Sequence, residues 1–125
     1  MENVKENVQD EVTEALTMIH DYIENLLRAI TEINEELRGQ RAEDTDDFLK
    51  SILNGVNFVT EVFNLTRDYL NEEEELMNKD SINLLISDFM NAYKSGSDEV
   101  LADALERDIQ VYLEQFHESI EKRCY

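Results

Sequence analysis

Residues 12–37 read VTEALTMIHDYIENLLRAITEINEEL, and their apolar side chains recur at alternating steps of four and three. That spacing places one seam of apolar side chains along a long helix. The seam comprises Val12, Leu16, Ile19, Ile23, Leu26, Ile30, Ile33 and Leu37. The chain contains no proline, a residue that would interrupt such a helix. This stretch predicts an all-α protein whose longest helix contributes one side of a shared core.

Polar and glycine-containing breaks divide the rest of the chain into further helical segments. Gly39 can end the first helix in a left-handed conformation, and Asp46 suits the first turn of the second. The acidic run 72–75 suits a first turn as well, and Ser97 can cap the last helix. We expect helices at about 5–38, 46–70, 74–94 and 98–122, with the start of the third left open between residues 71 and 80.

The lengths of these helices and of their connections predict the architecture. Short connections between helices of this length favour antiparallel neighbours, and four such helices favour an up-down-up-down bundle. A chain of 125 residues is long enough to form one core without disulfides or metal. We therefore predict that residues 1–125 form a single domain, an antiparallel up-down-up-down four-helix bundle.

The composition is that of a folded, strongly acidic protein. The hydrophobic fraction of 42% is ordinary for a globular domain, whereas the net charge is −19. Nucleic acids and anionic membranes both attract positively charged surfaces, so neither is an expected partner. No secretion signal or membrane-spanning apolar stretch is recognisable, and we expect a cytoplasmic location.

No catalytic or cofactor-binding signature is recognisable. Glu114 and His117 form one Glu-x-x-His motif of the kind found in two-metal bundles. The corresponding position before His20 is Thr17, so the second motif is missing. A single cysteine, Cys124, cannot form an internal disulfide. We predict no enzyme activity, no catalytic residue, no metal ligand, no cofactor and no identifiable small-molecule ligand, with a bundle-core metal protein as the remote alternative.

One acidic residue of the last helix needs a partner. Asp108 lies at the edge of the apolar stripe of that helix, where a carboxylate requires a hydrogen-bond donor. Arg107 and Arg28 are both candidates, and the sequence does not choose between them.

The segment 46–70 carries two apolar stripes, which is more than one core face needs. The first comprises Ile52, Val56, Val59, Phe63, Thr66 and Leu70. The second, here called the second strip, comprises Phe58, Val62, Leu65 and Tyr69. Either this helix lies deep among its neighbours or the second strip is a surface for another chain. Gly55, inside the same helix, indicates close approach of a neighbouring helix.

The second strip carries the functional hypothesis. We predict a protein–protein interaction or chaperone-like adaptor that binds a basic amphipathic partner helix through this strip, with apolar anchors for affinity and acidic charge for steering. The alternative is a homodimeric structural protein in which the strip pairs with itself. On either hypothesis Val62→Glu removes binding or dimerisation and preserves helicity, whereas unfolding of that variant would place the strip in the core.

Three segments of the chain resemble a known family. They are Phe48-Leu49, Asn54-Gly55-Val56 with Phe58, and the stretch from Asp98 to Glu106. These segments look like a family of small uncharacterised proteins of Gram-positive bacteria, over about the last two thirds of the chain. The resemblance implies an all-α bundle with no established activity. In size, acidity and helix number the chain is also similar to cytoplasmic flagellar export chaperones.

Overall fold

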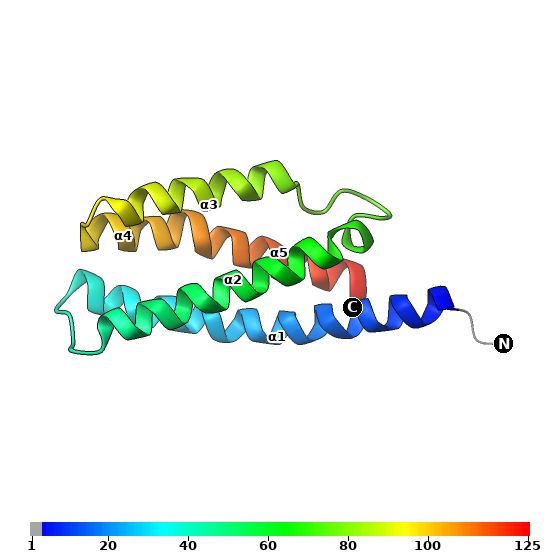
Figure 1. The fold of residues 1–125 in the computed structure, drawn as a ribbon, viewed down its shortest axis with the longest axis horizontal. Helices are drawn as coiled ribbons and strands as arrows, with labels where there is room; N and C mark the ends of the chain where they lie inside the picture. Colours follow the sequence, from blue (N-terminus) through cyan, green and yellow to red (C-terminus); the bar gives the residue numbers. More distant parts are fainter. Residues whose placement is uncertain (1–3) are drawn as a thin grey trace.

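The computed structural model describes residues 4–125, with side chains from residue 9 onward, and it is all-helical across that range. Its helices are α1 (Val4–Arg38), α2 (Thr45–Leu70), α3 (Lys79–Lys94), α4 (Asp98–Ala104) and α5 (Gln110–Cys124). The π-helical segment η1 (Leu105–Ile109) joins α4 to α5 without a break. The described chain thus forms four helical rods that pack as a bundle, which confirms the all-α prediction (Figure 1).

The seam of α1 forms one side of the core. Seven of its eight residues, from Leu16 to Leu37, are buried, and Val12 packs against them at the edge. α1 packs against α2 on one side and against α4 and α5 on the other, while α3 packs against α4 and η1. Figure 1 shows α1 beside α2 and α3 lying along α4.

The last rod supplies the opposite side of the core. The apolar stripe of this rod is buried throughout: Leu101, Leu105, Ile109, Tyr112, Leu113, Phe116 and Ile120. The ring of Phe63 in α2 meets the rings of Tyr112 and Phe116 edge-on, with centroids 6.3 and 5.3 Å away. These three rings join α2 to α5 at the centre of the bundle.

α3 begins at Lys79, inside the range 71–80 that the sequence left open, so the expected bound at residue 74 is wrong. The side chain of Asn71 explains the difference. Its amide nitrogen donates to the Met77 carbonyl (2.9 Å), and its oxygen accepts from the backbone N–H groups of Leu76 and Met77 (2.9 and 3.1 Å). These bonds satisfy backbone groups of Leu76 and Met77 within a non-helical connection. Asn78 then caps α3 by accepting from the Ser81 N–H.

The other predicted boundaries agree with the structure within two residues. Ser97 caps the last rod as expected, since its side chain accepts from the Val100 N–H. The expectation for Gly39 is wrong, because the glycine with a positive φ is Gly96, at 76°. Among the described residues, no helix combines the length and apolar character needed to cross a membrane.

Candidate functional site

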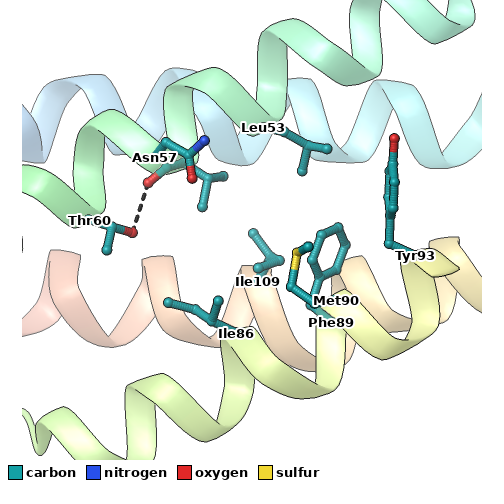
Figure 2. A pocket seen from close by; sticks show the side chains of 9 residues that line it. Leu53, Asn57, Thr60, Ile86, Phe89, Met90, Tyr93 and Ile109 are labelled. Atoms are coloured by element: carbon teal, nitrogen blue, oxygen red, sulfur yellow. Dashed lines mark hydrogen bonds between the residues drawn. The ribbon is translucent and has the colours of Figure 1, made fainter.

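α2 and α3 enclose an apolar groove on one side of the bundle. Across the described residues α2 and α3 form no interface comparable to that of α2 with α1 or of α3 with α4. A cavity of about 350 Å³ lies between them. Its lining consists of Leu53, Val56, Asn57 and Thr60 of α2, Ile86, Phe89, Met90 and Tyr93 of α3, and Ile109 of η1. Figure 2 shows the α2 and α3 side chains facing one another across this α2–α3 groove.

The lining of the α2–α3 groove is apolar and uncharged. None of its nine side chains carries a formal charge at neutral pH, and the polar groups are those of Asn57, Thr60 and Tyr93. Met90 and Tyr93 at the edge of the groove are 45% and 42% exposed. An apolar cavity with a few polar groups at its margin is typical of a site that buries apolar parts of a ligand.

Hydrogen bonds fix the wall of the groove. The Thr60 hydroxyl donates to the Val56 carbonyl (2.9 Å), the bond drawn in Figure 2, and it also lies 2.9 Å from the Tyr112 hydroxyl. Because the Thr60 proton is used on Val56, the Tyr112 hydroxyl donates to Thr60. Burial raises the pKa of Tyr112 to about 12, since the charged phenolate is disfavoured away from water. Tyr112 is fully buried, so its phenol lies in a dry layer beside the groove.

The floor of the groove is the π-helical segment. Ile109 of η1 lines the cavity, and single π-helical turns occur frequently at functional sites. Asp108 in the same segment is buried and accepts from Nε and Nη2 of Arg107 (3.0 and 2.7 Å). Its partner is thus Arg107, whereas Arg28 donates to Asn25. Hydrogen bonding to Asp108 raises the pKa of Arg107.

Two residues of the second strip, which lies on α2 and is from here on called the α2 strip, are covered by the protein itself. Val62 is only 9% exposed. The Tyr69 hydroxyl lies 3.2 Å from the Thr13 hydroxyl of α1, and the Arg123 guanidinium of α5 lies 3.9 Å from the centroid of its ring. Both side chains therefore serve the packing of α2 on its neighbours.

The other two residues of the α2 strip remain accessible. Phe58 packs edge-on against Tyr22 of α1, with centroids 5.4 Å apart, and is 40% exposed. Leu65 is 84% exposed. The accessible part of the strip consists of these two separated side chains, whereas the α2–α3 groove is a continuous cavity lined mainly by apolar side chains. Sequence reasoning missed the groove, because its residues resemble ordinary core positions.

The structure also brings together two histidines that sequence reasoning treated separately. The rings of His20 in α1 and His117 in α5 stack with centroids 3.8 Å apart, and Glu24 lies within reach of both. Glu114, which gave the Glu-x-x-His motif, accepts instead from Gln110 (2.9 Å). The relevant spacing is His-x-x-x-Glu, which occurs at His20 and again at His117. Those two matching spacings are the signal that could have found the cluster.

The comparisons with known proteins identify a family. No curated protein and no solved structure matches this chain. One family model, described as "Domain of unknown function (DUF8042)", matches residues 14–119. That range includes every residue that lines the α2–α3 groove. Since the match spans most of the 125 residues, the chain belongs to the DUF8042 family, a domain of unknown function.

Proposed function

We propose that this protein is a non-catalytic cytoplasmic adaptor, chaperone-like in its mode of binding, that holds a basic amphipathic helix of a partner protein in the α2–α3 groove. The observation that carries the proposal is the apolar, uncharged lining of that groove in a chain of net charge −19. Apolar side chains of the partner would fill the cavity, and its basic face would meet the acidic protein around it.

We propose that the four rods follow the antiparallel up-down-up-down order, which the short connections between α1 and α2 and between α3 and α4 favour.

The shape of the groove supports a helical partner. A helix laid over α2 and α3 would pack its ridges into the grooves of both, as in other helix–helix contacts. The cavity of about 350 Å³ has room for a few anchoring side chains, so the partner helix would lie across its mouth.

Charge supports a basic partner rather than a neutral one. Glu61 and Asp68 of α2 and Asp88 of α3 are exposed on the two helices that form the groove. Their carboxylates add to the negative field of the whole protein, which accelerates encounter with a positively charged helix. Because these groups are exposed, their contribution weakens as the salt concentration rises.

A designed peptide tests the proposal directly. The probe is a fluorescein-labelled amphipathic helix with leucine on one face and lysine on the other, and its affinity is measured by anisotropy at low and high salt. Met90→Glu places a charge at the groove, whereas Leu84→Glu is a matched control because Leu84 is exposed on α3 outside the groove. We expect binding about tenfold weaker or worse for Met90→Glu, unchanged binding for Leu84→Glu, and weaker binding at high salt.

Two outcomes would overturn the proposal. Unchanged or tighter binding by both variants would mean that the peptide binds the acidic field rather than the groove, because each substitution adds a negative charge. If the folded protein does not bind the peptide, the proposed adaptor function is wrong. Far-UV circular dichroism of both variants separates either outcome from a loss of fold.

Self-association is the alternative function, and the exposure of Phe58 and Leu65 on α2 favours it. A two-fold dimer needs only one self-complementary patch. Light scattering would then give twice the mass of the chain, and the melting temperature would rise with protein concentration. Leu65→Glu should return such a dimer to a monomer, whereas Met90→Glu should leave it intact.

A further inference from the structure

The histidine cluster between α1 and α5 has a regular geometry. α1 and α5 pack side by side, and each offers a histidine with a glutamate four residues later. Glu24 Oε1 lies 3.6 Å from His20 Nδ1 and 3.2 Å from His117 Nε2. On the other side of the stacked rings, Glu121 lies 3.6 Å from His20 Nε2 and 3.4 Å from His117 Nδ1. Each carboxylate thus faces one nitrogen of both imidazoles.

One of these imidazoles is buried without a full set of partners. His20 is 6% exposed, and among the described residues its Nε2 has no hydrogen-bond partner. A buried polar atom in that state costs free energy unless another group satisfies it. The nearest carboxylate oxygen, Oε2 of Glu121, lies just outside hydrogen-bond distance at 3.6 Å. A small shift of the half-exposed Glu121 side chain would satisfy it.

We propose that His20, Glu24 and His117 bind a divalent transition-metal ion of the Zn²⁺ type. Their ligand atoms lie within 4.8 Å of one another. Ligands around a tetrahedral Zn²⁺ lie about 3.4 Å apart, given bonds of about 2.1 Å. Glu24 and His117 are partly exposed, so rotation of their side chains closes the difference. His20 binds through Nδ1 and His117 through Nε2, and Asp21, 3.2 Å from His20 Nδ1, or water completes the coordination.

Glu121 acts as a positioning residue for both histidines. With the metal on the Glu24 side, the remaining nitrogens, His20 Nε2 and His117 Nδ1, carry protons and face the Glu121 carboxylate. A carboxylate that accepts from the second nitrogen of a metal-bound histidine fixes its tautomer and orientation. This arrangement also gives the buried Nε2 of His20 its missing partner.

Coordination has a structural consequence that can be observed. The two rings are stacked at an interplanar angle of 19°, and a metal bond lies in the plane of an imidazole ring. The more exposed ring, that of His117, therefore turns out of the stack when the ion binds. The nitrogen donors favour zinc, cobalt, nickel or copper over magnesium and calcium, which prefer oxygen ligands.

Calorimetric titration of tag-free protein with Zn²⁺ tests the proposal, with Mg²⁺ as the reference ion. We expect one Zn²⁺ per chain and at least about tenfold weaker binding for Glu24→Gln, His117→Gln and Glu121→Gln. Glu114→Gln is the matched control, because Glu114 lies on the same helix and accepts from Gln110 outside the cluster. This control should bind Zn²⁺ as the unmodified chain does.

Nuclear magnetic resonance of the imidazole nitrogens supplies a readout that does not depend on affinity. On saturation with Zn²⁺, His20 Nδ1 and His117 Nε2 should shift to the values of metal-bound nitrogen, and their second nitrogens should carry protons. Equal weakening in Glu24→Gln and Glu114→Gln, or equal binding of Mg²⁺, would show adventitious binding to the acidic surface and overturn the proposal. Unshifted imidazole resonances would overturn it as well.

Discussion

The two long faces of α2 are packed differently. Toward α1 the helix is packed closely, with Gly55, Val59 and Val62 buried in the interface. Toward α3 it leaves the α2–α3 groove, where Asn57 is exposed and Leu53 and Thr60 are only partly buried. The same helix therefore serves as a core element on one side and as one wall of an open site on the other.

Differences between the two partners of α2 explain this asymmetry. α1 has 35 residues and carries an apolar seam for most of its length, whereas α3 has 16 residues and α2 has 26. A helix as short as α3 cannot cover the whole of α2. α3 also packs on α4 and η1 of the last rod rather than on α2. The groove thus lies where α3 runs beside α2 but packs on the last rod.

The strongest test of the closed face of α2, the face that packs on α1, is a charge at Val62. Val62→Glu places a carboxylate where the side chain is 9% exposed, so we expect the free energy of unfolding to fall by at least about 3 kcal/mol. Leu65→Glu, three residues later on the same helix, should change it by no more than about 0.5 kcal/mol, because Leu65 is already in water. Urea unfolding followed by circular dichroism measures both.

This outcome would reverse the expectation drawn from sequence for Val62→Glu. Retained stability in that variant would mean that α2 separates from α1 easily, and the α2 strip would again be the better candidate for a partner surface. Equal destabilisation by both substitutions would contradict the exposure of Leu65.

Tyr112 reports how dry the layer beside the groove is. The folded protein holds the pKa of Tyr112 at about 12, against an ordinary value of 10.0 for the unfolded chain. Its contribution to stability is therefore complete below about pH 10 and is lost as the pH rises toward 12, by about 2–3 kcal/mol in total. Tyr112→Phe should flatten this part of the dependence of the unfolding free energy on pH. Identical slopes in both proteins would mean that water reaches the phenol through the groove.

The sequence was sufficient for the parts of the fold that depend on one helix at a time. The seam of α1, the stripe of the last rod and the Ser97 cap all follow from residue spacing and local chemistry. The start of α3 does not, because the run 72–75 fits a first helical turn as well as a connection. Only the hydrogen bonds of Asn71 to residues 76 and 77 decide between them.

The site was less predictable, since it depends on how helices lie relative to one another. Leu53, Ile86 and Met90 have the spacing of core residues, and the sequence does not reveal that α2 and α3 stay apart. Glu24 and His117 are 93 residues apart in the chain and meet only because α1 packs on α5. Properties of single helices are thus readable from sequence, whereas sites formed between helices require their packing.

The connection that precedes α3 offers a smaller test of the open face of α2, the face toward α3. Asn71→Ala removes three hydrogen bonds to residues 76 and 77, and we expect a loss of about 1–2 kcal/mol in the free energy of unfolding. Hydrogen exchange of the Leu76 and Met77 amides should accelerate. Asn64→Ala, at an exposed position of α2, is the control and should leave those two amides protected. Unchanged exchange in Asn71→Ala would show that α3 is positioned by its packing on the last rod alone.

Alanine substitutions on the two faces of α2 give the smallest expected effect. A Cβ atom at Gly55 would lie 2.7 Å from Leu26 Cδ2 and 2.8 Å from the Tyr22 hydroxyl, so both side chains must move to admit it. Gly55→Ala should therefore stabilise the protein by clearly less than the roughly 1 kcal/mol that helix propensity alone gives. Asn57→Ala, on the open face, should raise the free energy of unfolding by the full helix-propensity difference of about 0.5 kcal/mol. Thermal unfolding measures both, and a full gain at Gly55 would mean that α1 lies farther from α2 than this contact requires.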